Sequence, residues 1–223
     1  MSKSKVLFGL GLAMGIASQA HAITIHFQSV QGAAVVFNGA GSFTFVSPQG
    51  SGGSQFQILA VDDGLGNCVG NFGFMTGPFS IGAVSTDGAV QTAPVEGTGS
   101  LVLIDGQGKS LQGTLSWDTI STSGPDGYLN VFGTLNVTSI EYTGTDTDFS
   151  KLPPMATERV QFMLPQGTTG AAPLALQDLK TSSLELAFSG TISSAVRVPD
   201  TASTLLLLGM GGGALLLSVR RKS

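Results

Sequence analysis

Large apolar residues alternate with polar ones through much of the chain. In residues 184–197 the larger apolar side chains fall on even positions, and most polar ones fall on odd positions. A period of two is typical of a β-strand with one face on a core and the other in water. A similar alternation runs through residues 111–117, and an apolar stretch at 99–104 also predicts a strand.

Glycine-rich turns separate these predicted strands. The loop 105–109, Asp-Gly-Gln-Gly-Lys, indicates a hairpin because glycine supplies a positive φ at little cost, and a second hairpin is expected at 123–127. The tripeptide Gly-Thr-Leu or Gly-Thr-Ile begins at Gly113, Gly133 and Gly190, which we interpret as one hairpin pattern used again. Further strands are expected at 23–30, 33–38, 42–47, 55–61 and 72–75, and helix only around 156–164 and 174–179.

Many short strands with glycine turns and few helical signals predict an all-β fold. The expected architecture is an antiparallel β-sandwich or jelly-roll-like domain over residues 23–197, and a partly open barrel is the alternative. A long connection at 146–157 contains Pro153 and Pro154. The chain has 223 residues and no second region of distinct composition, so one such domain is expected.

The first 22 residues do not follow the alternation. Lys3 and Lys5 precede an apolar run at 6–17, and Ala20 and Ala22 flank His21 after it. A basic segment, a short apolar segment and a small-x-small site are the parts of a secretory signal peptide. We therefore expect a signal helix within residues 1–22, export through the Sec translocon and cleavage by signal peptidase after Ala22. A buried N-terminal helix is the alternative.

A second apolar run lies at the other end of the chain. Residues 204–219 carry no charge, and as a helix they would extend about 24 Å at roughly 1.5 Å per residue, close to one hydrocarbon thickness. Arg220, Arg221 and Lys222 follow directly, and the positive-inside rule places them in the cytoplasm. This pattern predicts one transmembrane helix that holds the precursor in the inner membrane. A buried helix is the alternative, which the glycines at 211–213 disfavour.

The sequence Val198-Pro199-Asp200-Thr201 stands just before this helix. Pro199 disfavours a helical conformation at Val198, so the motif is expected to be extended, as a protease cleft requires. Motif, membrane helix and basic tail, in this order over residues 198–223, resemble the PEP-CTERM sorting signals whose motif reads Val-Pro-Asp-Ser-Gly, with Thr201 and Ala202 in place of Ser and Gly. The resemblance implies an exosortase as partner, a membrane-embedded cysteine protease or transpeptidase that cuts near the motif. It also implies a Gram-negative bacterium that makes exopolysaccharide.

The charge is unevenly distributed. Of 10 basic and 14 acidic residues, five basic residues and one acid lie in the two ends, which leaves 5 basic and 13 acidic residues, or about −8, in residues 23–197. No Lys or Arg occurs between His26 and Gly108, so nucleic-acid binding is not expected. The chain as a whole has 32 glycines and 11% charged residues, and this low charge with glycine-rich strands favours a structural or adhesive role.

Few residues suggest catalysis. Cleavage after Ala22 leaves His26 as the only histidine, so neither a zinc cluster nor a Ser-His-Asp triad is expected, and His26 is interpreted as a residue on the polar face of a strand. Cys68 is the only cysteine and forms no intramolecular disulfide; a buried inert thiol is expected, and an intermolecular or lipid-linked thiol is the alternative. A glycosidase needs two facing carboxylates, for which Asp118 and Glu141 are the candidates.

Two kinds of binding site are considered. Clustered loop oxygens make calcium the least implausible metal, although neither cluster matches an EF-hand and no metal or cofactor is expected; the candidates are Asp62, Asp63 and Asn67 in one loop and Asp146 and Asp148 in another. A small sugar-stacking surface would need Trp117, Tyr128 and Tyr142 on one face, whereas core packing is the simpler interpretation of Trp117.

The sequence therefore predicts a non-enzymatic secreted protein, sorted by an exosortase to the cell surface or the exopolysaccharide matrix. A polysaccharide-binding module at the cell surface is the first alternative, and a glycan hydrolase is the second. The expected organisation is a signal peptide at 1–22, a β domain at 23–197 and a sorting signal at 198–223.

Overall fold

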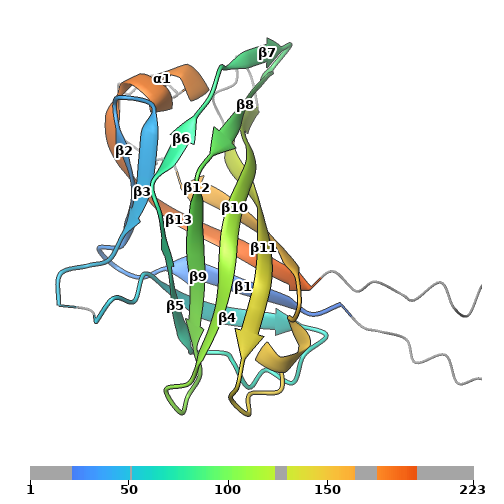
Figure 1. Ribbon diagram of the computed structural model, residues 1–223. Coiled ribbons are helices and arrows are strands. Elements are labelled where there is room, and N and C mark those ends of the chain that lie inside the picture. Colours follow the sequence, from blue (N-terminus) through green and yellow to red (C-terminus); the bar gives the residue numbers. More distant parts are fainter. Residues whose placement is uncertain (1–21, 51, 124–129, 164–174, 195–223) are drawn as a thin grey trace, which may run out of the picture. The chain divides into compact units, whose positions relative to one another are not determined.

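The computed structural model describes residues 22–50, 52–123, 130–163 and 175–194, and these residues form mainly antiparallel strands (Figure 1). The strands are β1 (Thr24–Ser29), β2 (Ala34–Asn38), β3 (Ser42–Val46), β4 (Phe56–Asp62), β5 (Phe72–Thr76), β6 (Phe79–Ile81), β7 (Ser85–Asp87), β8 (Val90–Glu96), β9 (Thr98–Ile104), β10 (Ser110–Ser123), β11 (Asn130–Tyr142), β12 (Ala156–Met163) and β13 (Ser183–Ser194). The helical elements in these residues are a 3₁₀ turn, η2 (Phe149–Lys151), and one short helix, α1 (Leu176–Thr181).

The sheet is organised around the long strands β10, β11, β12 and β13, which pair in this order. Beyond β13, residues 189–193 pair with β1 and residues 183–186 pair with β2. Beyond β10, residues 110–116 pair with β9 and residues 119–122 pair with β8. Two series of short strands, β1-β4-β5-β9 and β2-β3-β6-β8, therefore each connect β13 to β10, and the sheet closes on itself by both routes. Figure 1 shows β1 and β4 at one end of the domain and β2, β3 and α1 at the other.

Aromatic rings from both sets of strands fill the interior. The Trp117 ring on β10 is 6% exposed, stacks at 6.1 Å on Phe162 of β12 and meets Phe43 of β3 edge-on at 5.0 Å. Burial of a large apolar side chain contributes about 1.5–3 kcal/mol, so this cluster is a main source of stability. The other rings in it belong to Phe27, Phe37, Phe45, Phe56, Phe79 and Phe188.

The repeated Gly-Thr tripeptides lie inside strands, and those at Gly113 and Gly133 stand on the two paired arms of the second predicted hairpin. Gly113, Gly133 and Gly190 belong to β10, β11 and β13. A Cβ atom at Gly133 would overlap the six-membered ring of Trp117, and one at Gly190 would lie 2.6 Å from Cζ of Phe27. Each of these two glycines is required because a ring on the neighbouring element occupies the space of its missing side chain.

The predictions of an antiparallel all-β domain and of the early strands are confirmed. The hairpin at 105–109 joins β9 to β10 as expected, and Ser123 pairs with Asn130 across the second predicted hairpin. The helix expected at 174–179 corresponds to α1, but the helix expected at 156–164 is wrong because this segment is β12. Its helix-favouring residues are outweighed by pairing with β11 and β13 along both edges.

Within the described ranges no helix is long and apolar enough to cross a membrane. The predicted signal helix at 1–22 and the predicted transmembrane helix at 204–219 fall outside these ranges, apart from Ala22. So do the sorting motif at Val198, Pro199, Asp200 and Thr201 and the basic residues Arg220, Arg221 and Lys222. These parts of the sequence analysis remain predictions.

Candidate functional site

A depression of about 390 Å³ lies on the outer face of the domain, over β1, β13, β12 and β11. Because alternate side chains of a strand point to the same face, six polar or aromatic side chains from these strands surround it. They are His26, Phe132, Arg159, Gln161, Ser189 and Thr191. Gly190 and Phe27 also line it, although the Phe27 side chain is buried at 2% exposure.

Strand register fixes the order of these side chains. Arg159 lies opposite Thr191 of β13, and Thr191 lies opposite His26 of β1. In the adjacent row, Gln161 of β12 stands between Phe132 of β11 and Ser189 of β13. Neighbouring strands are about 4.8 Å apart, so each row presents closely spaced polar groups on a rigid surface.

Arg159 is the main charged group of the depression. Its guanidinium carbon lies 4.8 Å from the centre of the Phe132 ring, in a cation–π contact. Within the part of the chain that the structure describes, the ion pair found is that of His26 with Asp62, so Arg159 is not paired with an acid there. Its cross-strand neighbours are the neutral Thr134 and Thr191. The guanidinium N–H groups are therefore available to an external acceptor.

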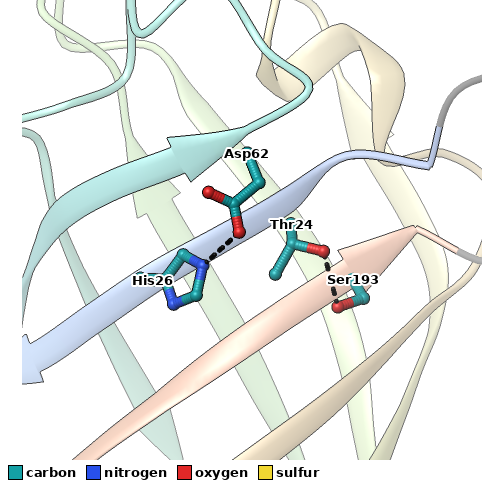
Figure 2. A network of polar contacts seen from close by, with 4 residues as sticks. All are labelled: Thr24, His26, Asp62 and Ser193. Atoms are coloured by element: carbon teal, nitrogen blue, oxygen red, sulfur yellow. Dashed lines mark hydrogen bonds and ion pairs between the residues drawn. The ribbon is translucent and has the colours of Figure 1, made fainter.

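His26 and Asp62 form an ion pair at the margin of the depression (Figure 2). The His26 Nε2 atom lies 2.7 Å from Oδ2 of Asp62, and the two side chains are 41% and 66% exposed. Two residues before His26 on β1, the hydroxyl group of Thr24 lies 3.1 Å from that of Ser193 on β13. The expectation that His26 lies on the polar face of a strand is confirmed. The hydrogen bond of His26 goes to a carboxylate and not to a nucleophilic hydroxyl.

The loop acids proposed as calcium ligands mainly hold backbone N–H groups. The buried Asp148 accepts hydrogen bonds from the backbone of Leu65 at 2.7 Å, Asn67 at 2.8 Å and Cys68 at 3.4 Å. Asp146 accepts from the backbone N–H groups of residues 148 and 149. Among the described residues, no group of three or more His, Cys, Asp or Glu side chains could hold a metal ion. The structure thus joins the loops at 63–71 and 145–152 through Asp148 itself.

The remaining calcium candidates, Asp62 and Asp63, and the aromatic candidates for a sugar-stacking surface do not come together in the structure either. Asp62 bonds to His26, while Asp63 is exposed and has φ 57°. Trp117 lies in the core, and Tyr128 lies outside the described residues. Tyr142 donates its hydroxyl proton to Oδ2 of Asp105 at 2.6 Å. The described members of the proposed stacking surface therefore do not share an exposed face.

The Tyr142–Asp105 contact fixes the hairpin between β9 and β10. Asp105 also accepts from the backbone of Gln107 at 2.9 Å and Lys109 at 2.7 Å. Desolvation acts to raise the pKa of Asp105, but the hydrogen bonds from Tyr142, Lys109 and Gln107 together lower it. Desolvation and the Asp105 carboxylate raise the pKa of Tyr142 to about 12. Both groups thus stabilise a loop.

Cys68 is fully buried, which confirms the expectation of a buried thiol. Desolvation, with the carboxylates of Asp148 and Asp146, raises the pKa of Cys68 to about 12. Because the thiolate is the reactive form, this thiol is inert in the folded domain.

The two carboxylates considered for glycoside hydrolysis are not close neighbours. Asp118 and Glu141 are exposed on β10 and β11. The register places Glu141 opposite Gln112, whereas Asp118 follows Trp117, which lies opposite Leu135. The two side chains are therefore several residue pairs apart along the same ladder.

A buried carboxyl group was missed by the sequence analysis. Glu158 on β12 is 0% exposed, and neither carboxylate oxygen has a hydrogen-bond partner among the described residues. Desolvation raises the pKa of Glu158 to about 8. The alternation of Ala156, Val160 and Phe162 would have predicted an inward Glu158, but only once this segment was recognised as a strand.

Comparison with known proteins finds none that is similar to this chain. No protein-family model matches it, and neither a curated protein nor a solved structure is significantly similar to it.

Proposed function

We propose that the chain is a non-enzymatic secreted protein of a Gram-negative bacterium, which an exosortase sorts to the cell surface or the extracellular matrix. The observation that carries the proposal is the sequence of the tail, in which a Pro-Asp motif, an uncharged segment at 204–219 and three basic residues follow one another. The signal peptide at 1–22 supports export, and the inner membrane holds the precursor before processing.

The hydrogen bonding at the ends of the β domain supports removal of both terminal segments. The backbone N–H of Ile23 donates to the Ser194 hydroxyl at 3.0 Å, and the backbone N–H of Ser194 donates to the Ile23 carbonyl at 3.0 Å. β1 and β13 continue this pairing from Thr24 and Ser193 onward. The first and last strands of the described residues thus stabilise each other, and the strands between residues 23 and 194 pair among themselves.

The packing also supports the sandwich form of the predicted fold. Phe162 of the long strand β12 meets Phe37 of β2 at 5.7 Å, and Trp117 of β10 meets Phe79 of β6 at 5.7 Å. Side chains of the long strands and of the short strands therefore meet across one core, as in a sandwich, while the same strands also pair around the closed sheet. We infer a jelly-roll-like sandwich whose second layer consists of two short-strand series.

A non-enzymatic role is supported by the chemistry of the described residues. Asp118 and Glu141 do not converge, and His26 is bonded to Asp62 and not to a hydroxyl. A polysaccharide-binding module remains the second candidate because the outer-face depression combines Arg159, Phe132 and uncharged polar groups. A structural role in the matrix does not exclude binding through this surface.

The sorting proposal is tested by Asp200→Ala, which changes the predicted motif. The variant is expected to accumulate as full-length precursor in the inner-membrane fraction, while the wild type reaches the surface or medium in a shortened form. Asp118→Ala is the matched control, since Asp118 is an exposed acid outside the motif. Normal release of the Asp200→Ala variant, or equal retention of both variants, would contradict the proposal.

A further inference from the structure

We propose that the outer-face depression over β1, β13, β12 and β11 binds the carboxylate of an acidic saccharide through Arg159. The proposal deepens the proposed function, because it assigns a ligand class to the exported domain and rests on that domain meeting saccharides outside the cell. It uses the geometry of the depression and not the sorting tail.

Arg159 provides the charge for this recognition. Its guanidinium carbon lies over the Phe132 ring at 4.8 Å from the ring centre, and this contact restricts the motion of the group. A guanidinium group binds a carboxylate through two parallel N–H···O bonds, which are stronger than bonds between neutral groups. In a domain with 13 acids and 5 basic residues, an arginine without an acidic partner among the described residues is a local positive site.

The side chains around Arg159 suit a polyhydroxylated ligand. Gln161, Ser189 and Thr191 are uncharged groups that can both donate and accept hydrogen bonds, and they stand on adjacent strands. At the margin, Nε2 of His26 is bonded to Asp62, which leaves Nδ1 for a hydroxyl group of the ligand. Sugar hydroxyl groups also both donate and accept hydrogen bonds, so they can pair with these side chains in either direction.

The depression also has an apolar surface for the C–H face of a sugar ring. Phe132 supplies this surface, because its ring is only partly buried at the β11 side of the depression. Gly190 keeps the adjoining part of β13 free of a side chain. Flat apolar surface bordered by a few oriented polar groups is the usual composition of a small-ligand site.

The pairing of the strands argues against a peptide as the ligand. β11, β12, β13 and β1 each pair with a neighbour on both sides in this region, so no strand edge is free for an added strand. A peptide would have to bind without backbone pairing, which is the main source of affinity in strand addition. Recognition here must use side chains, as it does for a saccharide.

The test measures binding by calorimetry, with the full chain purified in detergent and a galacturonate tetramer as probe. A neutral galactose tetramer and a hexaglutamate peptide serve as comparison ligands. The galacturonate tetramer is expected to bind at least tenfold more tightly than the neutral tetramer, because loss of one charge-assisted interaction costs about 1.5–3 kcal/mol. It is also expected to bind more tightly than hexaglutamate, which has carboxylates but no sugar hydroxyl groups for Gln161, Ser189 and Thr191. Backbone amide signals of β12 and β13 around the depression should shift on titration.

Two variants assign the binding to Arg159. Arg159→Gln should weaken galacturonate binding by about tenfold or more, whereas Lys109→Gln, which removes an exposed positive charge at the β9–β10 hairpin, should change it less than about twofold. Phe132→Leu keeps the charge but removes its ring support, and should weaken binding to an intermediate degree. Circular dichroism and the melting temperature of each variant show that it is folded.

Equal binding of the neutral tetramer, tighter binding of hexaglutamate, an unaffected Arg159→Gln variant or no binding of any probe would each overturn the proposal. The outcome is separable from sorting, because the processed mass of Arg159→Gln reports on the tail alone. Correct processing without saccharide binding refutes the ligand assignment alone. Saccharide binding by a protein that reaches the cell surface with its tail intact refutes the sorting proposal alone.

Discussion

The buried carboxyl group of Glu158 makes the stability of the domain depend on pH in an unusual direction. In the folded state its pKa is about 8, whereas the ordinary value is 4.5. The folded state therefore binds more protons than the unfolded state between these pH values. The protonated group contributes fully to stability below the unfolded pKa, and that contribution is lost as the pH rises through the folded pKa.

The magnitude follows from the size of the shift. At about 1.4 kcal/mol for each unit of pKa, the difference corresponds to a loss on the order of 4–5 kcal/mol between pH 4.5 and pH 9. The cause is the transfer of the carboxylate from water to a site where none of the described residues donates a hydrogen bond to it. Since domains are stable by about 5–15 kcal/mol in total, this single residue should dominate the alkaline side of the stability curve.

The assay is urea unfolding followed by circular dichroism at several pH values from 4 to 9. Glu158→Met keeps a similar volume and removes the titrating group, so the variant should lose the decline and be more stable than the wild type at pH 9. Glu141→Gln is the matched control because Glu141 is exposed on the neighbouring strand, and it should keep the wild-type profile. Parallel pH profiles for the wild type and Glu158→Met would refute this reasoning.

Three further predictions concern the core and the loops. Gly133→Ala should destabilise the domain by about 2–3 kcal/mol and change the fluorescence of Trp117, because the added methyl group overlaps that ring, whereas Gly106→Ala, with no atom closer than 3.8 Å, should leave both unchanged. Asp148→Ala should lower the free energy of unfolding by about 3 kcal/mol in urea titrations and make Cys68 reactive toward a thiol-specific disulfide reagent, since backbone N–H groups lose their acceptor; unreactive Cys68 would contradict this. Tyr142→Phe should cost about 1–2 kcal/mol in the same titrations, and an unchanged midpoint would count against the role of its hydroxyl group.

The strands could be predicted from the sequence because a period of two is a local property of the chain. Phe43 and Phe45 of β3, for example, point inward as their spacing requires. The sequence allows a helix around residues 156–164, and only the pairing of this segment with distant strands makes it β12. Local helix propensity is a weak guide for a segment that forms backbone hydrogen bonds with a neighbouring strand on both sides.

The closure of the sheet and the site on it could not be predicted in this way. The pairing of β1 with β13 joins residues up to 169 positions apart, and no local pattern encodes that contact. The depression brings Arg159 beside Phe132, His26 and Thr191 from four different strands, so its members have no common sequence motif. The Gly-Thr-Ile tripeptide at Gly190 is visible in the sequence, but the packing of this glycine against Phe27 depends on the same long-range pairing.

The central claim is that the chain is exported and then trimmed at both ends. The most direct test is the intact mass of the protein recovered from the cell surface or medium of its native host, combined with sequencing of its two ends. The account predicts an N-terminus at Ile23 and a C-terminus near Asp200, without residues 204–223. A surface or extracellular form that is intact through Ser223 would contradict it.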